Sequence, residues 1–448
     1  MSRKLWIVLA LGVVVAGMGV VAFETRRASQ AQLRGTLAAQ AEAGMGSTLD
    51  DLVAMAPPVD LARQERAFTW MQVRRGEPSS YSRPLAEDWF LDGGATPPAG
   101  DIAWADAQGP EMEVLRTLLR EGPLCLSSLG WIRLDLEKVR VMPIGRRQPR
   151  MPHLLRLREA HRWLAFEAMC EQDPSPALED LDRLAEALDA PGCLVDALVA
   201  GACAPMRDRA YVRLALREKV SEERLQRWLE APARGPLWIA EAWRAERLLY
   251  WAPLGQKVLR GAGTADLFFD AQGGLSDWLH GASHLATLLE CFEATEAHMR
   301  GGMSLETLRA SESRARTLDG PYALAFANRH SMSVVAVSWR AEHRAARLGV
   351  RLARLAHARG RTPVDREEAR RWLGGHAKGL DAGAWDVALR YERVDEKRFR
   401  LTIDPDAPLP DVLRDCSPHT QILGSHLGRP ASTRRLVLRQ GTFEYAIL

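Results

Sequence analysis

The sequence lacks the local patterns that mark most catalytic and metal sites. Its six cysteines include no Cys-x-x-Cys pair and no zinc-finger spacing. It also contains no Gly-x-Ser-x-Gly, no Ser-x-x-Lys and no P-loop, so the common sequence signatures of hydrolases and nucleotide-binding enzymes are missing. From the sequence we therefore assign no catalytic residue and no cofactor.

Lysine and net charge are also scarce. Six of the 60 basic residues are lysine, and the formal net charge is +3. A chain so close to neutral has no strong field to attract nucleic acid or an anionic lipid surface. We expect no nucleic-acid partner, and we attribute the arginine bias to GC-rich codon usage.

Charge is absent altogether from residues 5–23. As a helix this stretch is about 28 Å long, close to the hydrocarbon thickness of a lipid bilayer. It predicts a transmembrane anchor, marked by Leu5, Trp6, Gly12, Ala16 and Phe23. The two small residues among these are spaced for close packing of two such helices, although small residues are also ordinary in a lipid-facing helix.

A cleaved signal peptide with a cut site after Ala22 is the alternative. The apolar run is longer than the roughly 7–15 residues of a usual signal-peptide core, which favours the anchor. Arg3 and Lys4 precede the run, whereas the basic residues after it are offset by Glu24. This charge pattern predicts a cytoplasmic N-terminus, a single pass through the cell inner membrane and a periplasmic body.

The rest of the chain shows mainly the periodicity of helices. From about residue 152, apolar residues recur in steps of three and four on a face that includes His161. Four leucines follow on one face of the next helix, between Leu178 and Leu188, and Pro191-Gly192 ends it. We expect an array of antiparallel helical hairpins resembling an α-solenoid, and the pair at 154–190 is similar to a tetratricopeptide-type hairpin.

Further helices are expected at 24–44, from Thr48 or Asp50, at 110–121, from Ser175, from near Cys193 toward Glu218, from Ser221, and at 275–300, 304–317 and 321–359. Residues 124–141 suit a short strand or a helix equally. The longest helix carries His343 or Ala346 on its inner stripe and ends at Gly360. Alternation in 385–391 and 399–403 predicts a β-hairpin, and 435–439 with 442–448 suggests a second.

The expected fold class is therefore mainly α with a small C-terminal α+β element. The predicted divisions are a membrane anchor (1–23), a helical stem with a Pro/Gly-rich linker at about 75–109 (24–150), a helical-hairpin domain (151–330), and a long helix with β-hairpins (331–448).

The order of elements from 334 to 403 carries a resemblance. A long helix ends in Gly360-Arg361-Thr362-Pro363, and two segments containing Leu389-Arg390-Tyr391 and Phe399-Arg400-Leu401 follow a short helix. This layout resembles a group of uncharacterised bacterial single-span envelope proteins from planctomycete-like genomes, and the same order occurs in the major pseudopilins of type II secretion. Tyrosine is usual at the position of Thr362, and no prepilin cleavage motif precedes the anchor. The resemblance implies a fold and membrane attachment, and no activity.

Two sets of residues are weak candidates for a site. His280 and His284 are one turn apart on a predicted helix and could bind a metal with a third ligand, although a solvated or buried histidine pair is the simpler explanation. Glycine follows the first of them, so the pattern is not His-Glu-x-x-His. In a periplasmic body Cys170 could form a disulfide with Cys193 or Cys203 across a helical hairpin, and buried free thiols are the alternative.

These features predict a membrane-anchored, extracytoplasmic helical scaffold that binds another envelope protein. A hydrolase-like envelope enzyme, whose residues converge only in the fold, is the first alternative. A structural component of a secretion or pilus-like assembly is the second. A deep polar pocket with perturbed acid–base residues would favour the enzyme, and neighbouring genes for a secretion ATPase would favour the assembly.

Overall fold

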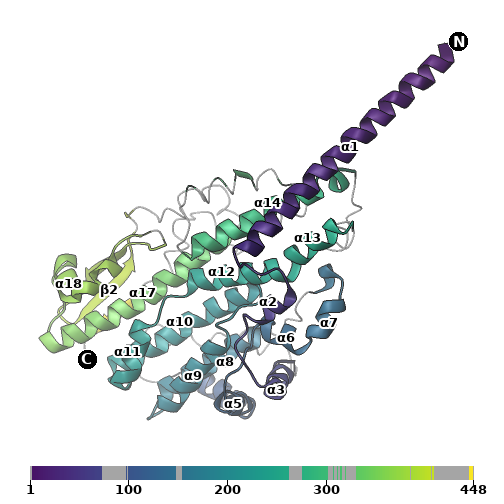
Figure 1. Ribbon diagram of the computed structural model, residues 1–448. Helices are drawn as coiled ribbons and strands as arrows, with labels where there is room; N and C mark the ends of the chain where they lie inside the picture. Colours follow the sequence, from purple (N-terminus) through teal and green to yellow (C-terminus); the bar gives the residue numbers. More distant parts are fainter. Residues whose placement is uncertain are drawn as a thin grey trace. The chain divides into compact units, whose positions relative to one another are not determined.

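The computed structural model is mainly helical and includes a small antiparallel sheet near the end of the chain (Figure 1), which confirms the expected class. It describes residues 3–72, 99–147, 154–261, 275–300, 329–383, 385–404 and 443–446, and a few isolated positions between them (97, 306, 310, 313, 314, 318, 406 and 407). Side chains at the start of the chain are described from Met18 onward.

The chain divides into two compact units, each assembled from three separate stretches. Unit 1 comprises Met1–Met55, Asp135–Pro149 and Trp243–Ala327, and unit 2 comprises Ala56–Leu134, Arg150–Ala242 and Asn328–Leu448. This division differs from the contiguous segments expected from composition. Periodicity identifies the apolar face of a helix but not the distant helix that covers it. It therefore cannot show that a unit is assembled from separate stretches of the chain.

Unit 1 is built on α1 (Arg3–Glu42), which runs without a break from the apolar stretch into the stem. Its C-terminal half lies beside α14 (Leu275–Met299) (Figure 1). Ser29 Oγ donates to the carbonyl of Leu279 at 2.8 Å, and Gln40 Nε2 donates to that of Leu289 at 3.2 Å, so the two helices run in the same direction. The buried stripe of α1 recurs every three or four positions at Ser29, Leu33, Thr36 and Gln40.

The earlier part of α1 is different. Met18, Val20, Val21 and Phe23 expose between 62% and 66% of their surface. In the part of the chain that the structure describes, no helix combines the length and the hydropathy of a membrane span. The transmembrane assignment of residues 5–23 stays a prediction.

The remaining elements of unit 1 are short: α2 (Leu49–Val53), α7 (Leu136–Val141), η2 (Ile144–Arg146), the π-helix η3 (Arg247–Trp251) and α13 (Ala252–Leu259). Thr48 caps α2 as expected, because its hydroxyl accepts from the Asp51 N–H while the Asp51 carboxylate accepts from the Thr48 N–H at 2.9 Å. Arg247 is buried and donates to the carbonyl oxygens of Met45 and Gly46, which fixes the turn after α1.

Unit 2 opens with α3 (Leu61–Gln72), α5 (Ala99–Arg120) and α6 (Ser128–Leu134). Residues 124–141 are thus helical wherever they are regular, in α6 and α7. The predicted linker at 75–109 is wrong at its C-terminal end, because α5 begins at Ala99; residues 73–96 lie outside the described residues. Four alanines between 99 and 107 favour the helix, and Asp101 suits the positive end of its dipole.

The helical-hairpin region contains α8 (Leu154–Cys170), α9 (Ser175–Ala187), α10 (Leu194–Leu216), α11 (Glu222–Glu230) and α12 (Gly235–Glu246). The predicted leucine face of α9 is confirmed, since all four leucines from Leu178 to Leu188 are at most 1% exposed. Ser221 occupies the N-cap position of α11, but its side chain makes no capping hydrogen bond. α9 begins at Ser175, as expected; Pro174 is its N-cap, and the N–H of Ser175 donates to the carboxylate of Asp173 at 3.0 Å.

The C-terminal part of unit 2 holds α17 (Arg329–Arg359), α18 (Arg366–Leu373), the 3₁₀-helix η5 (Gly374–Leu380) and strands β1 (Leu389–Arg393), β2 (Arg398–Ile403) and β3 (Phe443–Ala446). Gly360 ends α17 with φ +69°, as expected. The first predicted hairpin is confirmed, with Tyr391 opposite Leu401. β3 pairs with β2. The second predicted hairpin stays a prediction, because its first strand at 435–439 lies outside the described residues, as do most of 304–317 and 321–328.

Candidate functional site

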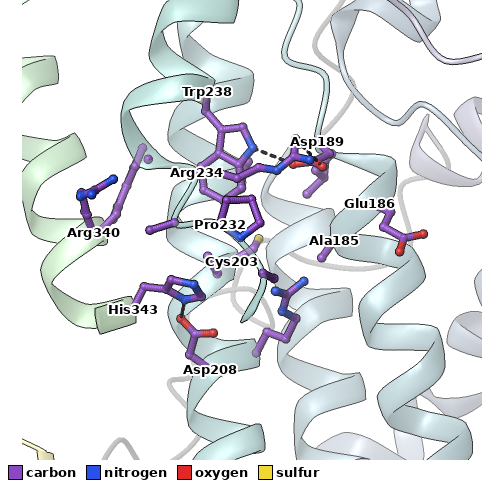
Figure 2. Close-up of a pocket in the computed structure, with 18 of the residues that line it drawn as sticks. Ala185, Glu186, Asp189, Cys203, Asp208, Pro232, Arg234, Trp238, Arg340 and His343 are labelled. Carbon is purple, nitrogen blue, oxygen red and sulfur yellow. Dashed lines mark hydrogen bonds and ion pairs between the residues drawn. The ribbon is translucent and has the colours of Figure 1, made fainter. Parts of the chain in front are cut away.

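Several helices of unit 2 surround a cavity of about 270 Å³, which we name the central pocket (Figure 2). α8, α9, α10, α12 and α17 contribute to it, together with the loop between α11 and α12. The volume would hold about nine water molecules, at roughly 30 Å³ each, or a small organic molecule of similar size. Its chemistry comes from His161, Cys203, Arg207, Asp208, Trp238 and His343.

One wall of the central pocket is aromatic, and it depends on a glycine. A Cβ atom at Gly201 would lie 2.1 Å from the ring of Trp339, so only glycine lets α10 and α17 approach this closely. Trp339 in turn meets Trp238 edge to face, with ring centroids 6.2 Å apart. The small side chains of Ala200 and Ala204 on α10 leave the space beside this wall open.

Asp208 and His343 form a buried pair that links α10 to α17. Nδ1 of His343 lies 2.6 Å from Oδ2 of Asp208, and the Trp228 indole N–H donates to Oδ1 at 2.9 Å (Figure 2 shows the first contact). Burial alone would raise the pKa of Asp208, but the charge and hydrogen bond of His343, with Arg207, hold it below its usual range. The carboxylate fixes Nδ1 as the donor, which leaves Nε2 of His343 buried and without a hydrogen-bond partner among the described residues.

His161 on α8 repeats this arrangement with a backbone acceptor. It is 1% exposed, and its Nδ1 donates to the carbonyl of Leu157 at 2.9 Å. Burial, with a smaller contribution from the charge of Arg207, lowers the pKa of His161 to about 4. The ring is therefore neutral near pH 7, and its Nε2 is a lone-pair acceptor without a partner in the described part of the chain.

Arg207 supplies a cation to the same pocket. Its closest carboxylate is that of Asp182, with Nε 3.9 Å from Oδ1, which is too long for a hydrogen bond. Burial opposes the charge of Arg207, but Asp182 and Asp208 outweigh it and raise the pKa of the guanidinium. Nε has no hydrogen-bond partner among the described residues, so an arginine that lines the cavity keeps one charged donor unsatisfied.

The other charges around the pocket are paired. Arg234 Nη1 lies 2.6 Å from Asp189, and the indole N–H of Trp238 donates to the same carboxylate at 2.9 Å (Figure 2). Arg340 Nε lies 2.5 Å from Asp386. Of the three guanidinium groups at the pocket, only Arg207 lacks a hydrogen-bonded carboxylate among the described residues.

Cys203 lies between these groups (Figure 2) but is not an activated nucleophile. It is 1% exposed, and burial raises the pKa of its thiol to about 12. A catalytic cysteine requires the opposite shift, because the thiolate is the reactive form. The pocket therefore combines binding groups with one acid–base pair, and it contains no poised thiolate.

The metal candidates from the sequence lie elsewhere. His280 and His284 are on α14 in unit 1, with stacked rings whose centroids are 6.2 Å apart. Throughout the described residues, no group of three or more His, Cys, Asp or Glu side chains is placed to hold a metal ion. The pair therefore has no third ligand of these types in the described chain.

The disulfide prediction is corrected. Cys170, Cys193 and Cys203 are all free thiols in the structure. Cys170 lies near Arg213 and Cys203 near Arg158, so α8 and α10 run in parallel and the two thiols are offset by about ten residues, roughly 15 Å along the helices. Cys193 lies 3.3 Å from the hydroxyl of Ser128, away from both.

Sequence reasoning found part of this site. It placed His161 on the inner face of its helix, which the 1% exposure of His161 confirms, and it offered His343 or Ala346 for the inner stripe of α17, where Ala346 is fully buried and the side chain of His343 is 12% exposed. It missed Arg207 and Asp208. The available signal was an acidic residue on the core side of a helix: Asp208 is 3% exposed and lies three positions before the buried Tyr211. Such a residue needs a buried partner, and the sequence does not show which one.

Comparison with known proteins gives no further information. No family model, no curated protein and no solved structure matches this chain.

Proposed function

We propose that this chain is a membrane-tethered helical protein that binds a small molecule in the central pocket. The observation that carries this proposal is that three residues lining one cavity each have a buried nitrogen atom with no hydrogen-bond partner in the described part of the chain: Nε2 of His161, Nε of Arg207 and Nε2 of His343. Buried polar atoms in folded proteins are almost always hydrogen-bonded to protein or water. A ligand with matching groups would satisfy all three.

The tether is supported by α1. Its uncharged segment 5–23 is long enough to cross a bilayer, and the helix continues from it into the stem. The exposed apolar residues from Met18 to Phe23 point in several directions around the helix, as expected of a surface that lipid covers. The protein would then hold the part of the chain after residue 23 on the periplasmic side of the inner membrane.

Alkaline carbonate extraction and protease treatment of spheroplasts test the tether. We expect the full chain to remain with the membrane pellet, and added protease to degrade the body from outside. Release by carbonate, an intact body, or a mature product that begins at residue 23 would contradict it.

A thermal-shift screen of small polar metabolites tests the pocket. The matched variants are Ala204→Leu, which fills the pocket, and Ala202→Leu, which adds the same atoms on the exposed side of α10. We expect some compounds to raise the melting temperature of the wild-type protein and of Ala202→Leu, but not of Ala204→Leu. If no compound shows this dependence on Ala204, the pocket is not a ligand site.

The Asp208–His343 pair favours one second candidate, a hydrolase that activates water. An imidazole oriented by a buried carboxylate, with its other nitrogen free toward a cavity, has the geometry of a general base. Replacing His343 by Gln would abolish turnover of an activated ester by the purified protein. Equal turnover by the two proteins would leave only the binding role. The roles as a protein scaffold and as a secretion component stay predictions.

A further inference from the structure

The central pocket contains one donor that requires an anionic acceptor. The guanidinium of Arg207 has an unsatisfied Nε and only a 3.9 Å contact to Asp182. The planar fork of arginine matches a carboxylate in two parallel hydrogen bonds, and such charge-assisted bonds are the strong ones. The neighbouring arginines are not available for this role, because Arg234 and Arg340 already bind Asp189 and Asp386.

The pocket also contains two acceptors that require a donor. Hydrogen bonds to Leu157 and Asp208 fix Nδ1 of His161 and of His343 as donors, and in this tautomer the acceptor of each ring is Nε2. An O–H or N–H group of a ligand would satisfy these atoms, whereas a bare carboxylate would be repelled by them.

The donor and the acceptors belong to one small space. The positive charge of Arg207 lowers the pKa of His161 on α8. It also lowers the pKa of Asp208 on α10, which is the partner of His343. A cavity of about 270 Å³ suits a small organic molecule. The complementary groups of the ligand must therefore lie within a few bonds of one another.

We infer that the central pocket binds a small monocarboxylate with a hydroxyl or amino group next to the carboxylate, that is, an α-hydroxy or α-amino acid. Arg207 takes the carboxylate, and Nε2 of His161 and of His343 accept from the neighbouring donor. The edge-to-face Trp238–Trp339 wall contacts the apolar remainder. This inference rests on the pocket function proposed above and adds the chemistry of the ligand.

A neutral sugar fits the groups less well. It would give the Nε of Arg207 only a neutral acceptor, and a hydrogen bond to a neutral acceptor is weaker than one to a carboxylate. A simple amine would satisfy the imidazoles, but it would offer no acceptor to Arg207 and would add a second positive charge beside it. Only a molecule with both groups satisfies all three nitrogen atoms.

Isothermal titration of the full chain in detergent with four isosteric probes tests the inference. L-Leucine and (S)-2-hydroxy-4-methylpentanoate carry both groups and separate amino from hydroxy acids. Leucinamide lacks the carboxylate, and 4-methylpentanoate lacks the donor. L-Alanine and L-lactate repeat the comparison at smaller size. We expect at least one acid with both groups to bind, and loss of either group to weaken it by about tenfold or more, the factor expected for one charge-assisted hydrogen bond.

Variants then assign the carboxylate to Arg207. Arg207→Gln should weaken the best acid by at least about tenfold and leave leucinamide unchanged, whereas Arg207→Lys should fall between the wild type and Gln. Arg217→Gln, on the same helix but outside the central pocket, is the control and should bind as the wild type does. Circular dichroism of each variant checks folding, and the comparison of acid with amide in the wild type needs no variant.

Each outcome is decisive. Equal binding of acid and amide, or equal loss in Arg207→Gln and Arg217→Gln, would overturn the inference. If other compounds bind in an Ala204-dependent manner and no acid does, the ligand class is wrong and the pocket function stands. If no compound depends on Ala204, both proposals fall.

Discussion

The neutral, buried imidazole of His161 should make unit 2 sensitive to mild acid. The pKa of His161 is lowered from 6.5 to about 4 in the folded state. Between these two pH values the unfolded chain binds a proton that the folded chain excludes, so the free energy of unfolding decreases as the pH falls through this window. At about 1.4 kcal/mol per pH unit, the full difference corresponds to about 3 kcal/mol, most of it lost by pH 4.5.

Replacing His161 by Gln removes this proton-linked loss and keeps a side chain that can hydrogen-bond. The free energy of unfolding is measured from urea-dependent hydrogen exchange of peptides from α8, at several pH values from 7 to 4.5, in the full chain. The difference between the wild type and His161→Gln isolates the imidazole, because the other titrating groups are common to both. We expect this difference to change by about 2.5 kcal/mol over the range, with the wild type losing more stability in acid.

A matched control is His357→Gln on α17. The side chain of His357 is 61% exposed, and its removal should give no comparable dependence on pH. Parallel curves for the wild type and His161→Gln between pH 7 and 4.5 would refute the reasoning, since a buried neutral imidazole requires them to diverge.

Three further changes test the packing of unit 2. Arg116→Met should destabilise the protein by about 3 kcal/mol in urea denaturation, because it leaves the 1% exposed carboxylate of Asp180 with only one of its two arginines. Gly201→Ala should cost about 1–3 kcal/mol by forcing the Trp339 ring away, and it should blue- or red-shift the tryptophan fluorescence. Cys170 is the exposed one of the five described cysteines, so native protein treated with maleimide should be modified there, and the four buried thiols should react only after denaturation.

Much of the local structure could be predicted from the sequence. The leucine face of α9, the end of α17 at Gly360 and the hairpin that turns at Asp395-Glu396 all follow from spacing and turn chemistry over a few residues. The start of α5 does not follow from composition. Its first turns contain Gly and Asp, which are typical of loops, but the alanines among them favour a helix.

The central pocket could not be predicted in this way. Its walls come from helices that are far apart in the chain, and the histidines on α8 and α17 meet only after folding. Each of these histidines occupies an inner face, where a packed core histidine would look the same. What distinguishes them is that Nδ1 has a hydrogen-bond partner whereas Nε2 is buried without one among the described residues.

The unbroken course of α1 has a geometric consequence. Because α1 is one continuous helix, the angle around its axis between residues 5–23 and the elements packed on its C-terminal half is fixed. Inserting one residue between Phe23 and Ser29 would rotate α14 by about 100° around the α1 axis relative to residues 5–23, and would move it about 1.5 Å farther along that axis. A series of one to four inserted residues would therefore rotate α14 stepwise around the α1 axis relative to residues 5–23. The tether proposed above then predicts that any role that depends on facing a neighbour in the membrane is lost and regained with the period of the helix.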